Sequence, residues 1–226
     1  MRYLISALLL MLASQDGSFE GTVTATTAFK PGQHSTVTFT EKWPRERYDI
    51  VTKDRGKLIV LYDLEKGSRT VIVPSRKVYW TVDVSERAKQ WRDAVERAGY
   101  TPGPATIVVA PTTRTDKIAG RTCKYFTVGY EQEADVCAAS GMGEYIADQE
   151  IDGARAMGGK GPARDTMYDD LGSRFPGGFF PLKIVSRADG PERVVWQVTS
   201  IDRHPVPDDT FDVPPGYTQT APPRIQ

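Results

Sequence analysis

The side chains best suited to acid–base catalysis at neutral pH are scarce in this chain. Its two histidines, His34 and His204, lie at opposite ends of the sequence, each beside turn residues. Neither belongs to an HExxH motif, so the sequence does not predict a zinc site of that kind. No GxSxG motif occurs, and a hydrolase triad would need a histidine beside a serine and an acid. The histidines therefore predict no catalytic centre.

Glycine-rich and acidic segments do not match known cofactor motifs either. Residues 153–160 approximate a phosphate-binding loop, but Gly161 stands where that loop carries the Ser or Thr that binds magnesium. Residues 141–143 lack the third glycine of a dinucleotide fingerprint. The adjacent acids at 169–170 and 208–209 lack the spacing of a calcium loop. We expect no enzyme, cofactor or metal, although an acid pair for glycoside hydrolysis would be brought together only by folding.

The two cysteines, Cys123 and Cys137, are the remaining reactive groups, and their positions favour a disulfide. They lie in the alternating or apolar runs 121–128 and 134–139, with a short polar segment between them, which is typical of a hairpin. Antiparallel pairing about residue 130 would place them directly opposite each other, at a separation that a disulfide spans. The alternative is two free thiols buried in a cytosolic core.

The start of the chain favours export, which agrees with a disulfide. Arg2 precedes an almost wholly apolar run, 3–13, which Asp16 and Gly17 end. A transmembrane helix needs roughly 20 apolar residues, so this run is too short to span a bilayer. It has the basic and apolar regions of a secretory signal. We expect residues 1–15 to be a signal peptide and the mature protein to be periplasmic or secreted, without a transmembrane segment; the alternative is a buried first strand or helix.

The composition argues against a nucleic-acid partner and against two classes of small protein. The 226 residues include 29 Lys and Arg against 29 Asp and Glu, and this zero net charge disfavours a nucleic-acid partner. Basic residues are scattered among acids, without the aromatic platform that binds single strands. Two cysteines are too few for a zinc ribbon or a disulfide-rich miniprotein.

Strand patterns dominate the chain. Thr, Val, Ile and Tyr are abundant between residues 19 and 82, and turn residues divide this stretch evenly. Val37 and Phe39 alternate with threonines, which is typical of an antiparallel strand with one apolar face. The short connections favour a meander. The predicted strands are 20–28, 35–41, 47–52, 57–63, 68–73, 77–82, 106–110, 117–118 leading to 123–128, 134–139, 182–186 and 193–200.

One amphipathic helix is predicted to interrupt the sheet. Asp83 or Ser85 can cap its start and Gly99 can end it. Apolar residues recur around Trp91 at three- and four-residue spacing, so this stripe should pack on the sheet. A second helix is expected over 144–156.

The rest of the chain is predicted to be less regular. Residues 157–178 are rich in glycine and form a long loop, a candidate lid. A single domain is expected over 16–217, followed by a flexible tail, 218–226.

Short motifs resemble the bacterial DUF4412 family of exported proteins of unknown function. Residues 115–125, TDKIAGRTCKY, resemble its I-A-G-x-x-C strand, and Cys137 matches a second cysteine. Residues 61–80 resemble its aspartate strand followed by a strand with an aromatic pair. Residues 178–183, GFFPLK, resemble its G-x-x-P-L strand. The resemblance covers about residues 19–217.

Proteins of this type are similar in fold to the lipoprotein carrier LolA. The resemblance implies a mainly β fold: an open, unclosed antiparallel barrel of about eleven strands, covered by one or two helices, whose concave apolar face holds acyl chains. It implies no catalytic residues. No cysteine follows the apolar run to accept a lipid anchor, which suggests a soluble exported form.

The predicted function is the binding of a lipid, an acyl chain or another apolar ligand between the sheet and its helices. One alternative is that the same side chains fill a closed core. Another is an envelope interaction or scaffold protein that has no small ligand. The aromatic residues expected near the concave face are Tyr79, Trp80, Trp91, Trp196, Phe179 and Phe180.

Overall fold

The computed structural model describes residues 19–30, 33–53, 56–83, 108–129, 134–142, 180–187 and 190–223. They form twelve strands and two short 3-10 helices, η1 (Pro74–Arg76) and η5 (Asp208–Phe211). The strands are β1 (Glu20–Lys30), β2 (Gln33–Lys42), β3 (Arg45–Thr52), β4 (Gly56–Asp63), β5 (Ser68–Val73), β6 (Val78–Asp83), β7 (Val108–Ile118), β8 (Arg121–Gly129), β9 (Ala134–Ala139), β10 (Phe180–Ser186), β11 (Arg193–Asp202) and β12 (Thr218–Gln219).

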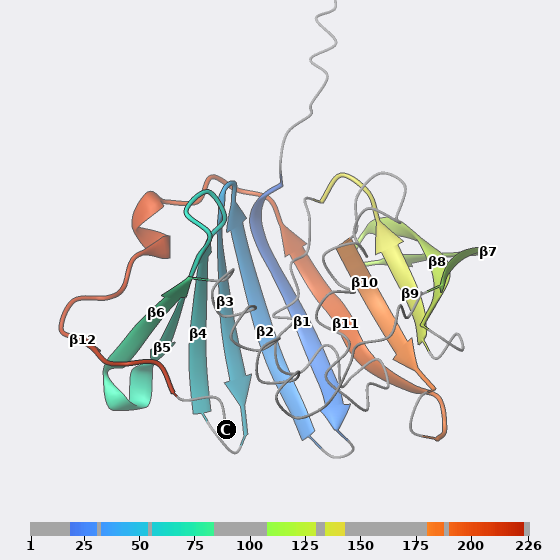
Figure 1. Ribbon diagram of the computed structural model, residues 1–226. Coiled ribbons are helices and arrows are strands. Elements are labelled where there is room, and N and C mark those ends of the chain that lie inside the picture. Colours follow the sequence, from blue (N-terminus) through green and yellow to red (C-terminus); the bar gives the residue numbers. More distant parts are fainter. Residues whose placement is uncertain are drawn as a thin grey trace, which may run out of the picture.

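All twelve strands belong to one sheet, in the order β12-β6-β5-β4-β3-β2-β1-β11-β10-β9-β8-β7 (Figure 1). Neighbouring strands are antiparallel, except that β12 runs parallel to β6. The end strands β12 and β7 do not pair with each other, so the sheet is open. The prediction of a mainly β fold on one unclosed sheet is confirmed.

Two strands differ from the sequence-based expectation. Residues 108–110 of the predicted segment 106–110, and the predicted segment 117–118, belong to one long strand, β7, which continues through Pro111. Residues 106 and 107 lie outside the described residues. Proline is tolerated there because β7 is an edge strand, and the ladder to β8 shifts register between Pro111 and Thr115. The additional strand β12 lies in the segment expected to be a tail.

Several predicted segments lie outside the described residues. They include the signal peptide 1–15, the helix around Trp91, the helix 144–156 and the loop 157–178. Of the first helix only Asp83 is described, and it is the last residue of β6. No helix within the described residues is long and apolar enough to cross a bilayer.

Cross-strand pairing gives the sheet two distinct faces. One row runs from Phe39 to Tyr48, Val60, Val71 and Trp80 on five consecutive strands, and all five belong to or pack on the main hydrophobic cluster. We call this side the inner face.

The next residue along each strand points to the opposite side, because side chains alternate. Ile59, Leu61 and Ile72 form a smaller cluster there, against which Val213 and Tyr217 pack. We call this side the outer face.

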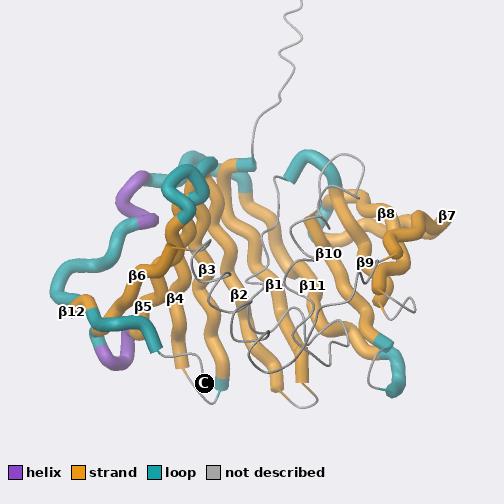
Figure 2. The backbone as a smooth tube through the Cα atoms, viewed as in Figure 1, coloured by secondary structure: helices purple, strands orange, loops and turns teal. Residues whose placement is uncertain are grey.

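The C-terminal segment 203–220, which we call the strap, returns to the first half of the sheet and lies beside β6 (Figure 2). The Thr218 amide donates to the Lys77 carbonyl at 2.9 Å, and the Thr220 amide donates to the Tyr79 carbonyl at 2.8 Å. Phe211 is buried, with the Arg45 guanidinium 5.0 Å from its ring centroid. The strap therefore covers the smaller cluster and pairs with the edge strand β6.

Cys123 and Cys137 form a disulfide with a Cα–Cα distance of 5.3 Å, as predicted. The predicted register is wrong, however, because Cys137 lies directly opposite Tyr125 rather than Cys123. The hairpin is centred one residue later than expected, and this moves the partner by two positions. Two residues along a strand return to the same face, so the cysteines form a diagonal pair that a disulfide still joins.

Candidate functional site

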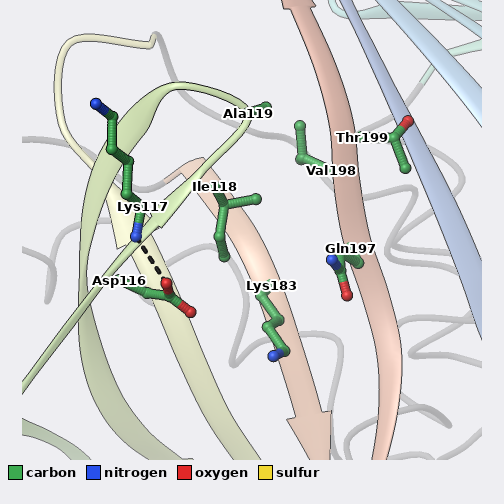
Figure 3. A pocket seen from close by; sticks show the side chains of 8 residues that line it. All are labelled: Asp116, Lys117, Ile118, Ala119, Lys183, Gln197, Val198 and Thr199. Carbon is green, nitrogen blue, oxygen red and sulfur yellow. Dashed lines mark hydrogen bonds between the residues drawn. The ribbon is translucent and has the colours of Figure 1, made fainter.

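A pocket of about 460 Å³ lies between the β7–β8 hairpin and the central strands β10 and β11 (Figure 3). The hairpin forms one wall and the central strands form the other. The lining residues are Asp116, Lys117, Ile118, Ala119, Lys183, Gln197, Val198 and Thr199.

The turn of this hairpin requires an uncommon backbone conformation. Ile118 pairs with Arg121, so only Ala119 and Gly120 form the turn. Their φ angles are 47° and 80°, which are the positive values that a two-residue type I′ turn needs at both positions. This tight turn places Ile118 and Ala119 on the pocket wall.

The carboxylate of Asp116 is held by two donors. The Lys117 amide donates to Oδ1 at 2.7 Å, and the Tyr125 hydroxyl donates to Oδ2 at 3.3 Å. Burial raises the pKa of Tyr125, and the negative charge of Asp116 raises it further. The hydroxyl therefore keeps its proton at neutral pH and remains a donor to the carboxylate.

Tyr125 is itself fixed by a charged network. The Arg114 guanidinium lies 4.2 Å from the Tyr125 ring centroid and donates to the Asp135 carboxylate at 2.8 Å. Arg187 donates to the other oxygen of Asp135 at 2.9 Å. The hydrogen bond from Arg187 and then that from Arg114 lower the pKa of Asp135, although burial opposes them. The network thus positions the ring that supports Asp116.

The opposite wall carries a lysine on an interior strand. Lys183 of β10 lies directly across from Gln197 of β11 and is half-buried. The Thr199 hydroxyl donates to the Thr24 carbonyl at 3.1 Å, which ties this wall to β1. Ile118 and Val198 belong to the main hydrophobic cluster, so the pocket borders the inner face.

A second polar feature crosses the inner face itself. Glu41, Glu46, Tyr62 and Arg69 lie in one cross-strand row on β2 to β5. The two glutamates are each 1 % exposed and Arg69 is 8 % exposed. The Tyr48 hydroxyl donates to Glu46 Oε2 at 2.9 Å, and the Arg69 guanidinium lies 5.9 Å from the Tyr62 ring centroid. This charged row limits the purely apolar part of the inner face on one side.

The structure brings together three of the aromatic residues predicted for ligand binding. Trp80 packs against the main cluster, and Trp196 and Phe180 belong to it. The Trp196 indole donates to the Pro181 carbonyl at 2.8 Å. Tyr79 lies on the outer face with the smaller cluster. Trp91 and Phe179 lie outside the described residues.

The polar residues of these two features were not predicted from the sequence as functional residues. Glu41 continues the inward positions of Val37 and Phe39, and a charged residue at such a position was a usable signal. Asp116 and Lys183 lay inside two of the family-like motifs but were not interpreted as partners. Only the three-dimensional fold places them at one pocket.

Within the described residues, no group of three or more His, Cys, Asp or Glu side chains could hold a metal ion.

Comparison with known proteins identifies the family. The family model "Domain of unknown function (DUF4412)" matches residues 19–217, which is most of the chain. The chain belongs to the DUF4412 family. No curated protein matches this DUF4412 chain.

Among solved structures, one of PNGF-II is similar at 12 % identity with a TM-score of 0.42. The match covers 90 % of this chain and 31 % of that chain, so the chain spans about a third of the length of that protein.

Proposed function

We propose that this DUF4412 protein is an exported binding protein that holds an apolar ligand, such as the acyl chain of a lipid, against its inner face. The observation that carries the proposal is the single hydrophobic cluster that extends from Trp80 at one side of the sheet to Tyr125 near the other. Its aromatic rings gather at the centre, where the Phe39 ring centroid lies 4.9 Å from Tyr48 and 5.8 Å from Phe180. Ligand sites of this kind are mainly apolar with a few polar groups.

The charged row narrows the proposed contact area. Glu41, Glu46 and Arg69 are buried at one side of the apolar surface, where an acyl chain would lie against charged groups. The acyl chain should instead lie along the neighbouring row of side chains, which begins at Phe39 and ends at Trp80. We also propose, from the sequence pattern alone, the helical cover around Trp91 that the resemblance to lipoprotein carriers implies.

Export to the periplasm or beyond is part of the proposal. The apolar run after Arg2 and the disulfide between Cys123 and Cys137 support it, because disulfides persist in oxidising compartments.

The proposal also states that the protein binds a ligand and does not catalyse a reaction. His34 lies at the start of β2 and His204 follows the end of β11. Both strands pair with β1, and the pairing places the two histidines beside opposite ends of β1.

Adjacent aromatic residues provide a matched test. Trp80 faces the inner side and Tyr79 the outer side, and both are half-buried. We expect Trp80→Ala to weaken the binding of a dansyl-labelled fatty acid by about tenfold, and Tyr79→Ala to leave it unchanged. Probe fluorescence in a titration of each purified variant measures this, with circular dichroism as the folding check. Equal losses in both variants, or no uptake by the wild-type protein, would overturn the proposal.

An interaction protein is the second candidate, and one surface residue favours it. Trp43 in the β2–β3 turn is 57 % exposed, the most exposed of the large hydrophobic residues described. A photo-crosslinking amino acid at position 43, introduced in the producing cell, should capture an envelope protein if this function is correct. The same amino acid at the exposed position Lys66 of the β4–β5 turn is the control. Capture at neither position would rule out a partner at this turn.

A further inference from the structure

We propose that the pocket between the β7–β8 hairpin and strands β10 and β11 binds a small zwitterion. The ammonium group of the ligand would lie at Asp116 and its anionic group at Lys183. This proposal does not rest on the binding of an apolar ligand at the inner face.

The charges of the two walls carry the argument. Asp116 and Lys183 line the same pocket, yet within the described residues neither forms an ion pair with the other or with a third side chain. A ligand with a single charge would be attracted by one wall and repelled by the other. A zwitterion in the correct orientation is attracted by both, so electrostatic complementarity selects it.

Asp116 is preorganised as the acidic wall. Each of its oxygens already accepts one hydrogen bond, from the Lys117 amide and from the Tyr125 hydroxyl. An ionised carboxylate has about four lone-pair sites, so both oxygens can still accept from a ligand. Arg114, which donates to Asp135, packs on the Tyr125 ring, so the tyrosine that donates to Asp116 is held in place.

Lys183 and Gln197 form the basic wall. They are direct cross-strand partners, so an ammonium and an amide stand side by side as donors for an anionic group. In Figure 3, Lys183 lies between Asp116 and Gln197, whereas the side chain of Lys117 points away from the other lining residues. Lys117 therefore contributes its backbone but not its charge to the pocket.

The size and the apolar part of the pocket suit a small ligand with a carbon skeleton. The volume of about 460 Å³ falls within the range of roughly 300 to 1,000 Å³ for ligand sites. Ile118, Ala119 and Val198 offer apolar contact between the charged groups. Two sources share this chemistry: a free amino acid, and the ethanolamine phosphate head of a lipid whose chains would run onto the inner face.

The test compares a zwitterion with its two halves. By isothermal calorimetry, we would titrate the full chain with glycerophosphoethanolamine and its two halves, glycerol phosphate and ethanolamine. We would also titrate it with alanine and its two halves, propionate and ethylamine. At least one zwitterion should bind about tenfold more tightly than either half. Preference for glycerophosphoethanolamine assigns a lipid head group, and preference for alanine assigns a free amino acid. If no zwitterion exceeds both halves, the proposal is wrong.

Variants identify the pocket as the site. Lys183→Met and Asp116→Asn should each reduce zwitterion binding by about tenfold or more, while Lys124→Met, a matched loss of charge at an exposed residue that does not line the pocket, should not. The exchanged variant D116K/K183D should recover binding with the ligand reversed, and this result would not follow from a merely structural role. An equal loss in Lys124→Met, or full binding by the well-folded Lys183→Met, would overturn the assignment. Uptake of the labelled fatty acid by Asp116→Asn should stay at the wild-type level, which separates this proposal from the proposed function.

Discussion

Asp135 and Asp208 show how burial decides the value of the same kind of ion pair. Each aspartate accepts hydrogen bonds from two basic side chains, Asp135 from Arg114 and Arg187, and Asp208 from Lys42 and Arg45. The side chain of Asp135 is 8 % exposed, whereas that of Asp208 is 71 % exposed. Solvent screens the exposed pairs far more strongly.

Asp135→Asn should therefore lower the free energy of unfolding by about 2 kcal/mol at neutral pH, as expected for buried hydrogen bonds to a charged group. The pKa of Asp135 is lowered in the folded protein, so the stabilisation is complete above the ordinary aspartate pKa of about 4 and disappears as pH falls through the lower, folded value. Urea unfolding of both proteins from pH 7 to pH 3 measures this. The difference should shrink only below about pH 4, and Asp208→Asn, the exposed control, should show no resolvable change.

Gly21 is required by its surroundings as well as by its backbone angle. Its φ is +144°, and a Cβ atom built there would lie 2.2 Å from the Asp202 carbonyl oxygen. Gly67 also has a positive φ, +61°, but a Cβ atom there would meet open space.

Gly21→Ala should destabilise the protein by more than about 2 kcal/mol, because β11 must shift to admit the methyl group. Gly67→Ala should cost about 1 kcal/mol, which is the backbone penalty alone. Thermal unfolding of the two variants compares them directly. If the two losses were equal, the close approach of β1 to β11 would not matter.

At the scale of elements, the disulfide ties two strands of the hairpin β8–β9 together. The two cysteines are 14 residues apart in sequence, and a loop of this length predicts a gain of about 3 kcal/mol through restriction of the unfolded chain. Replacing both cysteines with alanine should lower the free energy of urea unfolding by about this amount. A reductant should destabilise the wild-type protein similarly and leave the double variant unchanged. A double variant that a reductant still destabilises would point to a different cause.

Both edges of the sheet are protected from pairing with other chains. β7 carries Pro111 and an irregular ladder, and both features disfavour further strand addition. At the other edge, the two-residue strand β12 covers β6. The strap thus covers the edge of the sheet at β6 and also buries the smaller cluster on the outer face.

Removal of β12 should expose both the edge strand β6 and the smaller cluster on the outer face. A chain that ends at Phe211 loses Val213 and Tyr217, which pack on the smaller cluster of the outer face. It also loses the hydrogen bonds from the Thr218 and Thr220 amides to the carbonyls of Lys77 and Tyr79. We expect a lower Tm and concentration-dependent self-association, measured by thermal unfolding and light scattering. A chain that ends at residue 223 keeps the strap and should match the full chain. A truncated chain that stayed monomeric would show that β6 is not a pairing edge.

Local patterns in the sequence were sufficient for most of the strands and for the disulfide, but not for the continuity of β7, for β12 or for long-range pairing. Alternating apolar and polar residues predicted β2, for example, because its inward positions are Val37 and Phe39. The pairing of β1 with β11, and of β12 with β6, leaves no local signal. The sequence could not predict that Asp116 and Lys183 lie at one pocket for the same reason, since their strands are not neighbours in the sheet. Strand alternation alone would have separated Tyr79 from Trp80.

At the scale of the whole molecule, the sheet consists of two meanders, β1 to β6 and β7 to β11, which meet at the pair β1–β11. Val23, Ala25 and Val198 lie at this junction and belong to the cluster that extends into both halves. A meander alone would expose the ladder edge and the apolar contacts of the junction. The two halves should therefore unfold as one cooperative unit, although their hairpins are local.

Reciprocal substitutions test this cooperativity. Val198→Ala in β11 should cost about 2 kcal/mol through the cavity it leaves. In a cooperative molecule, native-state hydrogen exchange should then show the same loss of protection in β3 and β4 as in β9 and β10. Val60→Ala in β4 should lower protection in β9 and β10 to the extent that it does in its own half. Loss confined to the substituted half would mean that the meanders unfold independently, and the junction would then be an interface between two separate folding units.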